Sequence, residues 1–230
     1  MRNRRHTRYR TDEHLLIVLC ALIGIAACLG DLCMTHILGT WYPGYKPLLQ
    51  PMSDLGDDGS PVAQIASAWW VIMGLMFIAF GYGFYRAFSD YGKPAKMAAL
   101  MLALYGLGEG LGSGLVPGYP GGAFRTPGSI VHNLLGGVGV TAAFLLPFFI
   151  MKICSTQRRQ GLYWYSWFTT VPGILFFILF SVSTFYHPEG NWIVYTGLWQ
   201  RLFMLVYYLF FIWLGVMMLT RQKPVSRGRS

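Results

Sequence analysis

The chain has 230 residues, of which 54% are hydrophobic and only 12% are charged. Because an ordinary soluble domain carries about a quarter charged residues, this composition excludes a water-soluble globule. The formal net charge of +9 would suit a nucleic-acid-binding protein, but no RNA- or DNA-binding motif accompanies it. We therefore expect no nucleic-acid partner and attribute the charge to membrane topology and contact with membrane lipids.

Apolar runs long enough to cross a membrane recur along the whole chain. About 20 apolar residues in a helix span the hydrocarbon core of a bilayer. The sequence predicts an all-α integral membrane bundle of six transmembrane helices over residues 15–220, with basic tails at 1–14 and 221–230. The expected spans are, in chain order, residues 15–38, 62–88, 95–116, 129–153, 164–186 and 196–220.

Lysine and arginine residues are distributed unevenly between the two sides of this predicted bundle. Fifteen of the 18 fall in the two tails and around the connections that follow the second and fourth spans, all on one side. Only Lys46, Arg125 and Arg201 fall on the other side. Because cationic loops are retained in the cytoplasm, the sequence predicts a multi-pass protein of the inner (plasma) membrane with both termini cytoplasmic.

Three ionisable residues are expected below the outer membrane surface. Asp31 lies well inside the first span and Glu109 well inside the third, while Arg201 lies near the outer start of the sixth. Such groups are costly in a membrane unless they face a cavity or a partner. An ion pair of Arg201 with Asp31 or Glu109 would remove that cost. Such a pair either has only the role of orienting the helices, or one of the carboxylates lines a substrate cavity.

The fourth span begins with a histidine and an asparagine and continues with glycines. His132 and Asn133 precede Gly136, Gly137 and Gly139. The third span carries two glycine stripes, at 106, 110 and 114 and at 108 and 112, so we expect the third and fourth helices to pack closely. His132 is either a capping or interface residue or a general base or hydrogen-bond donor to a substrate.

The first external loop, residues 39–60, contains prolines, two tyrosines and a Ser53-Asp54 pair, and we interpret it as an ordered lid or a partly re-entrant plug. Ser53, Asp54 and His132 offer the residue types of a hydrolase triad, but no nucleophile elbow is present. The acids at 54, 57 and 58 do not match a calcium loop. His36, His132 and His187 lack zinc-ligand spacing, so we expect neither a metal nor a cofactor.

Several short motifs together resemble one family. They are Pro51-Met52-Ser53-Asp54-Leu55-Gly56, the glycine-rich third span ending Val116-Pro117-Gly118, the His132-Asn133 pair, and Gly197-Leu198-Trp199-Gln200-Arg201-Leu202. The chain is similar from the first span to the sixth to the multi-pass bacterial and archaeal membrane proteins grouped as domain of unknown function 998. The resemblance implies a six-helix bundle in which Ser53, Asp54, His132 and Arg201 belong to one outward-facing site. A more distant similarity is to ceramidase-like and adiponectin-receptor-like membrane hydrolases, whose seventh helix and histidine spacing this sequence lacks.

The function predicted from these residues is the binding or processing of a lipid or small amphiphile in an outward-facing polar pocket between the third, fourth and sixth helices. In an enzyme, His132 would be base or acid, Asp54 or Glu109 its partner, and Ser53 a nucleophile or hydrogen-bond donor. A variant uses Glu109 as the acid of an isomerase or cyclase. Residues assigned to the substrate are Arg201 as an anchor for an anionic head group, with Asn133, Asp31 and Trp199.

Two other classes of function stay open. In a small-solute transporter or permease, Asp31, Glu109 and Arg201 would form a coupling or gating network. In a non-catalytic membrane scaffold, the same charges would only fix helix packing.

Overall fold

The structure is a computed structural model that describes residues 2–118, 126–156, 160–186 and 192–221, without the side chains of residues 2–11. These residues form helices and loops and contain no strand. The long helices are α1 (Arg2–Trp41), α2 (Ala63–Phe88), α3 (Lys93–Tyr105), α5 (Pro127–Thr156), α6 (Gln160–Tyr186) and α7 (Thr196–Thr220). The short ones are η1 (Met52–Gly56), η2 (Ser89–Tyr91), the π-helix η3 (Gly106–Gly112), α4 (Ser113–Leu115) and η4 (Trp192–Val194).

The predicted fold class is confirmed. Six helical stretches are long and apolar enough to cross a membrane, and one of them is the continuous run of α3, η3 and α4 over Lys93–Leu115. The helix α1 begins at Arg2 rather than near residue 15, so the described part of the predicted N-terminal tail extends the first helix. The C-terminal tail beyond Arg221 lies outside the described residues.

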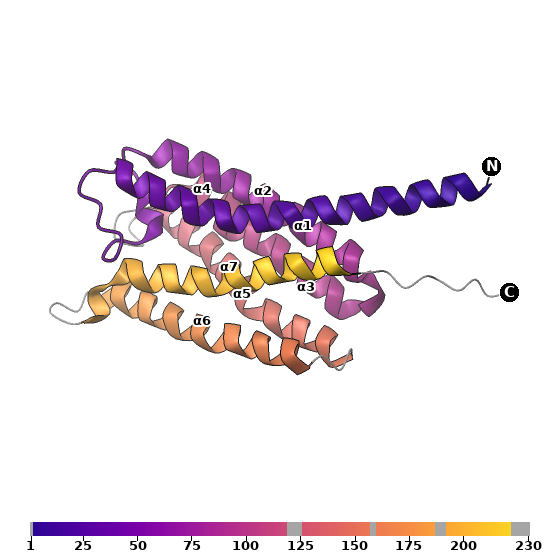
Figure 1. The fold of residues 1–230 in the computed structure, drawn as a ribbon. Helices are drawn as coiled ribbons and strands as arrows, with labels where there is room; N and C mark the ends of the chain where they lie inside the picture. The colour runs from indigo at the N-terminus through magenta and orange to yellow at the C-terminus, as the bar shows by residue number, and fades with distance from the viewer. Residues whose placement is uncertain (1, 119–125, 157–159, 187–191, 222–230) are drawn as a thin grey trace.

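Helices that follow one another in the chain pack side by side, and α7 returns to pack against α1, which closes the bundle into a ring. The helix α1 begins and α7 ends at the same end of the bundle (Figure 1). We call this the terminal end, and we call the opposite end, which carries residues 42–62, the loop end. Both ends of the described chain therefore lie on one side of a membrane.

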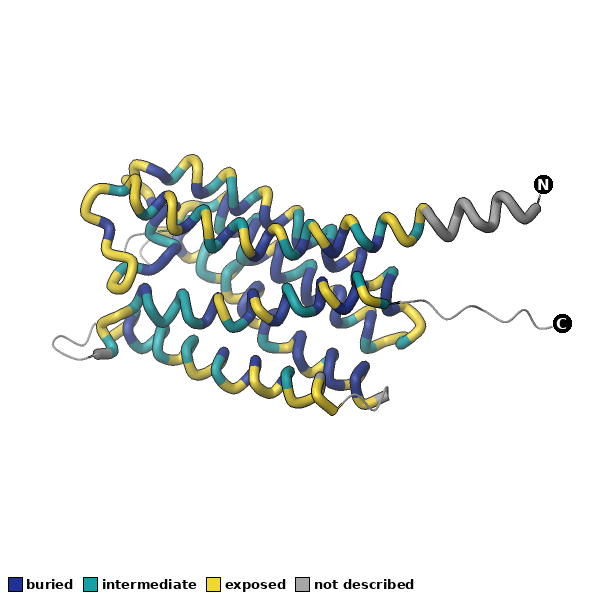
Figure 2. The backbone as a smooth tube through the Cα atoms, in the orientation of Figure 1, coloured by how far each residue is buried: buried dark blue, intermediate teal, exposed yellow. Residues whose placement is uncertain are grey.

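Aromatic residues fill the centre of the ring. Phe77 on α2, Tyr105 on α3 and Phe211 on α7 are all buried and meet edge to face, with ring centroids 4.7 to 5.3 Å apart. Exposed residues, drawn yellow in Figure 2, occur along all the long helices, and many of them are large and apolar. In a membrane these exposed faces contact lipid, so burial inside the bundle marks the surfaces that the helices share.

Glycines bring α3 and η3 close to both neighbouring helices. A Cβ added at Gly110 would lie 2.3 Å from the Cα of Gly74 on α2, and one added at Gly108 would lie 2.4 Å from the carbonyl oxygen of Leu135 on α5. The expected close packing of the third and fourth helices is therefore present. The other glycine stripe, which includes Gly110, packs against α2 instead.

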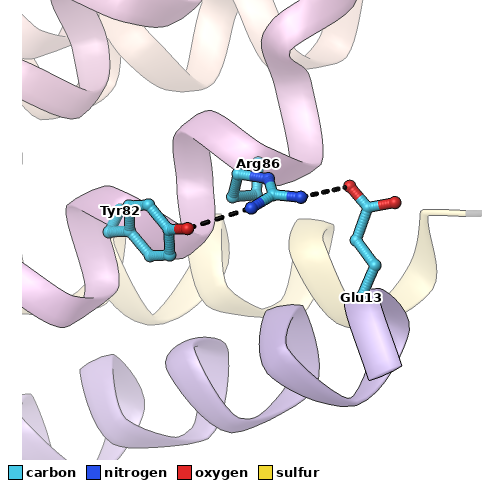
Figure 3. Close-up of polar contacts among 3 residues, drawn as sticks. All are labelled: Glu13, Tyr82 and Arg86. Carbon is cyan, nitrogen blue, oxygen red and sulfur yellow. Dashed lines mark hydrogen bonds and ion pairs between the residues drawn. The ribbon is translucent and has the colours of Figure 1, made fainter. Parts of the chain in front are cut away.

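Polar contacts at the terminal end join helices that are distant in sequence. Arg86 on α2 forms an ion pair of 3.0 Å with Glu13 on α1 and donates a 2.9 Å hydrogen bond to the Tyr82 hydroxyl (Figure 3). Arg221, at the end of α7, forms an ion pair of 2.6 Å with Asp90 after α2. The guanidinium of Arg221 also lies 4.4 Å from the ring centre of Phe88. These contacts fix the ends of α1 and α7 against α2.

Candidate functional site

A small polar cavity lies inside the bundle, below the loop end. It has a volume of about 40 Å³ and is bounded by α1, α2, η3, α4, α7 and the loop helix η1. A water molecule needs roughly 10–15 Å³ of such space, so the cavity has room for a few waters and is too small for a lipid. Its polar lining residues are Asp31, Ser53, Glu109, Ser113, Gln200 and Tyr208.

Asp31 is held in a fixed position by its neighbours. The residue is 1% exposed and lies ten residues before the end of α1, about 15 Å below the loop end. The indole N–H of Trp69 donates to its Oδ1 at 2.9 Å, and the hydroxyl of Tyr208 donates to its Oδ2 at 2.7 Å. Each carboxylate oxygen therefore has a donor from a different helix, α2 or α7.

Glu109 lies on the π-helix η3, where the backbone carries an extra residue per turn. Four of the seven residues of η3 are glycines, which tolerate the wider turn and the close approach of α2 and α5. Its Oε1 lies 3.5 Å from the Cβ position of Gly136 on α5. No described residue donates a hydrogen bond to the Glu109 carboxylate, so the cavity is where it can find a partner.

The predicted ion pair of Arg201 with Asp31 or Glu109 is wrong, and Arg201 does not line the cavity. The loop folds back onto the start of α7 and reaches the guanidinium first, because Arg201 lies only about 7.5 Å below the loop end. Within the described chain Arg201 has no ion pair with an acidic residue. It donates hydrogen bonds to the carbonyl oxygens of Pro47, Gln50 (3.1 Å) and Gly197 (3.0 Å) and to the hydroxyl of Tyr45 (2.8 Å).

The loop at residues 42–62 is ordered, and η1 covers the cavity. The amide oxygen of Gln200 accepts a hydrogen bond from the backbone N–H of Met52, and Leu55 is fully buried. Gly56 lies against the ring of Trp70, which also lines the cavity. The loop thus forms the plug that the sequence suggests.

Two acids of this loop have raised pKa values. The pKa of Asp57 is raised to about 7, mainly by burial and in addition by the nearby charges of Asp54 and Asp58. Burial also raises the pKa of Asp54 to about 6, although the charge of Arg201 opposes this shift. The third acid of this loop, Asp58, is exposed, whereas Asp57 is only 4% exposed.

The raised pKa of Asp57 predicts a pH-dependent stability. The folded protein holds a proton on Asp57 up to about pH 7, whereas an unfolded aspartate releases it near pH 4. The contribution of Asp57 to the free energy of unfolding is therefore greatest at low pH and falls as the pH rises from about 4 to about 7. We expect the melting temperature in detergent to fall between pH 4.5 and 8, and Asp57→Asn to remove most of that fall, which is worth roughly 2–4 kcal/mol. Asp58→Asn is the control, because that side chain is exposed. A profile that is the same in wild type and Asp57→Asn would contradict the assignment.

The other predicted site residues lie apart from the cavity. The Nδ1 of His132 is 2.7 Å from the carbonyl oxygen of Val116, and its Nε2 and the Oδ1 of Asp57 both lie near Gly118. Asn133 lines a groove of about 420 Å³ between α3 and α5, together with apolar residues. The indole of Trp199 donates to the carbonyl of Ile193 at 3.2 Å.

The structure does not assemble the suggested triad. Ser53 lines the cavity, while the Oδ1 of Asp54 is buried without a hydrogen-bond partner and His132 contacts Val116. Within the described ranges, no three His, Cys, Asp or Glu side chains gather as metal ligands, and His187 lies outside those ranges. Of the predicted residues, the cavity brings together Asp31, Glu109 and Ser53.

A second pocket opens between α1 and α7 at the loop end, with a volume of about 220 Å³. Arg201, His36 and Thr35 form its polar part. The remaining lining residues are Leu32, Pro47, Met52, Leu202 and Leu205. The pocket that Arg201 lines is thus formed by the first and sixth spans, and none of its described lining residues comes from the third or fourth span, which were also predicted to form it.

Sequence reasoning missed the residues that hold Asp31 and close the cavity. In the sequence, Tyr208 and Trp69 look like any aromatic residue of an apolar span. Ser113 and Gln200 look like any polar residue near a helix end. The depth of Tyr208 in the membrane could have identified it as a partner of Asp31. Tyr208 lies twelve residues from the start of α7, about 18 Å below the loop end and so close to the level of Asp31.

Comparison with known proteins places most of the membrane-spanning part of the chain in one family. No curated protein and no solved structure matches the chain. The sequence model of the family described as Protein of unknown function (DUF998) matches residues 25–217, which include the cavity, the loop and both pockets. The chain is therefore a multi-pass membrane protein of the DUF998 family.

Proposed function

We propose that the protein binds the head group of an anionic lipid, or of a similar anionic amphiphile, in the pocket between α1 and α7. The observation that carries this proposal is the composition of the pocket. Leucines at 32, 202 and 205 form an apolar wall, and Arg201 and His36 lie on the polar side. A lipid presents the same division between acyl chain and head group.

The charge of Arg201 favours an anionic ligand. An arginine stays protonated in proteins, and no described carboxylate forms an ion pair with this one. Its hydrogen bonds within the described chain use Nη1 and Nη2, so Nε has a hydrogen to donate to a phosphate oxygen. The loop contacts hold the guanidinium in place, which lowers the entropy cost of binding.

Binding is better supported than catalysis. No described hydrogen bond or ion pair joins any two of His132, Asp54, Glu109 and Arg201. An acid–base mechanism needs its groups within direct or one-water reach of the same substrate atoms. The roles assigned to these residues in an enzyme stay predictions, and the pocket with Arg201 supports a lipid-binding protein.

We further propose that the loop end faces the outside of the cell and that the membrane is the plasma membrane. Fifteen of 18 lysines and arginines belong to the side of the terminal end, which is the cytoplasmic side by the positive-inside rule. The ligand would then be a lipid of the outer leaflet.

The test is lipid retention by the purified full chain. The protein is reconstituted with equal amounts of phosphatidylglycerol and phosphatidylcholine, and the lipids that remain after mild delipidation are measured by native mass spectrometry. We expect phosphatidylglycerol to be retained, and Leu205→Trp, which fills the pocket, to lower its retention at least tenfold.

The matched control is Leu209→Trp, one turn further along α7. Leu209 is 51% exposed and does not line the pocket, so phosphatidylglycerol retention should match that of wild type. Equal retention of the two lipids, or wild-type retention by Leu205→Trp, would overturn the proposal.

A further inference from the structure

The cavity below η1 has features that a lipid-binding role does not use. It lies at membrane depth and is lined by two carboxylic acids, Asp31 and Glu109, with hydroxyl and amide groups around them. Among the residues that the structure describes, no lysine, arginine or histidine lines it. Buried acids without a basic partner are expensive in a membrane, so something other than a side chain must offset their charge.

We propose that the cavity is a binding site for one monovalent cation, a proton or a metal ion, held between Asp31 and Glu109. The two acids arrive from α1 and from the π-helix η3 and face the same space of about 40 Å³. Two ionised carboxylates in such a volume repel each other strongly, and one positive charge removes that repulsion. The site goes beyond the proposed function and does not depend on it.

The two acids have different surroundings, which gives them different roles in this site. Asp31 accepts hydrogen bonds from Trp69 and Tyr208, and these donors stabilise its ionised form and fix its orientation. Glu109 receives no hydrogen bond from the described residues, although the residue lines the cavity. Asp31 is therefore the positioned anion, and Glu109 is the group whose charge needs the cation.

The other lining groups suit a small hard cation. Ser53, Ser113, Gln200 and Tyr208 bring hydroxyl and amide oxygens, and oxygen ligands are those preferred by alkali and other hard cations. The volume admits one ion with water but no organic cation. Access from the loop end is controlled by η1, whose Met52 and Ser53 form part of the lining.

The groups that face Glu109 can be named for each packed element. Asp31 from α1 lines the same cavity, and Tyr105 on the adjoining turn of α3 interacts with Glu109 electrostatically. The helix α7 contributes Tyr208, and α2 contributes the apolar Met73 and the indole of Trp70. From α5, Gly136 and Gly139 lie against the Glu109 side chain. Asp31 is thus the charged partner that the described elements bring to Glu109.

The experiment measures thermal stability of the purified full chain against cation concentration and pH. A ligand that binds the folded state raises the melting temperature as its concentration rises. Sodium chloride and potassium chloride are titrated at fixed pH, with N-methylglucamine chloride as the ionic-strength control. A pH series in N-methylglucamine chloride alone tests the proton, and all proteins carry Asp54→Asn and Asp57→Asn so that the two loop acids with raised pKa values do not contribute.

Glu109→Gln is the test variant, because it keeps the shape of the side chain and removes its charge. We expect a rise of several degrees with sodium or potassium, or a pH dependence in their absence if the cation is a proton, and we expect Glu109→Gln to abolish the response. Asp58→Asn, an exposed acid outside the cavity, should respond as the parent does.

Two results would overturn the proposal. One is a melting temperature that depends on neither metal ion nor pH, and the other is a response that persists unchanged in Glu109→Gln. Lipid retention is measured on a different pocket with a different variant, so failure of one proposal leaves the other intact. The intrinsic fluorescence of Trp69, compared with Trp69→Phe, gives an independent readout, because its indole contacts the Asp31 carboxylate.

Discussion

Replacement of Arg201 by methionine is expected to release residues 45–50 from α7. The guanidinium donates to three backbone carbonyl oxygens and to the hydroxyl of Tyr45, and methionine keeps the length of the side chain while removing every donor. Hydrogen bonds to charged groups contribute about 1.5–3 kcal/mol each, and they are not additive, so we expect a loss of roughly 3–5 kcal/mol. Limited proteolysis of the loop and the melting temperature measure the effect.

The matched control is Lys46→Met, which removes a cation from the same loop. Lys46 is exposed, and its side chain forms no hydrogen bond in the described structure, so cleavage and melting should match those of wild type. Arg201→Lys should behave like Arg201→Met, since one ammonium group does not replace the in-plane donors at both Nη1 and Nη2 of the guanidinium. If the loop of Arg201→Met resists protease as well as the wild-type loop does, the hydrogen bonds of Arg201 are not what orders the loop.

Gly110→Leu is expected to prevent α2 and η3 from packing. The added Cβ would lie 2.3 Å from the Cα and 2.6 Å from the nitrogen of Gly74, and these backbone atoms cannot turn aside as a side chain could. Overpacking a core usually costs about 1–3 kcal/mol, and a forced separation of two helices costs more. We expect little monodisperse protein after detergent extraction, and a melting temperature lowered by at least 10 degrees in what remains.

The control for this substitution is Gly137→Leu. Gly137 is exposed on α5, and a Cβ added there would meet no atom within 4 Å. It should therefore be extracted and melt as wild type does. Normal yield and melting of Gly110→Leu would show that the two helices are not packed as described.

The sequence alone predicts the helices well, because membrane spans are determined by local hydropathy. The last span is expected at 196–220 and is found at Thr196–Thr220. The start of α1 is missed, since an Arg-rich segment outside the hydrocarbon core can still be helical. The π-helix is missed as well, because its glycines also fit a stripe in a regular helix.

The sequence predicts the candidate site only in part, because it does not give the direction in which each side chain points around the axis of its helix. Position in a span gives the depth of Asp31, Glu109 and Arg201, but it does not tell which neighbour each side chain faces. Asp31 and Tyr208 are 177 residues apart, and Arg201 and Pro47 are 154 apart, so these contacts depend on how the ring of helices closes. Their partners could therefore not be chosen from sequence.

The position of α7 has a mechanical consequence. Gln200 and Arg201 hold the loop at residues 42–62, and Tyr208, two turns beyond Arg201 on the same helix, donates to Asp31. Because a helix moves as a nearly rigid body, a rotation of α7 would displace both the loop and the hydrogen-bond donor of the Asp31 carboxylate. Opening of the entrance and release of Asp31 would therefore be coupled through the movement of α7.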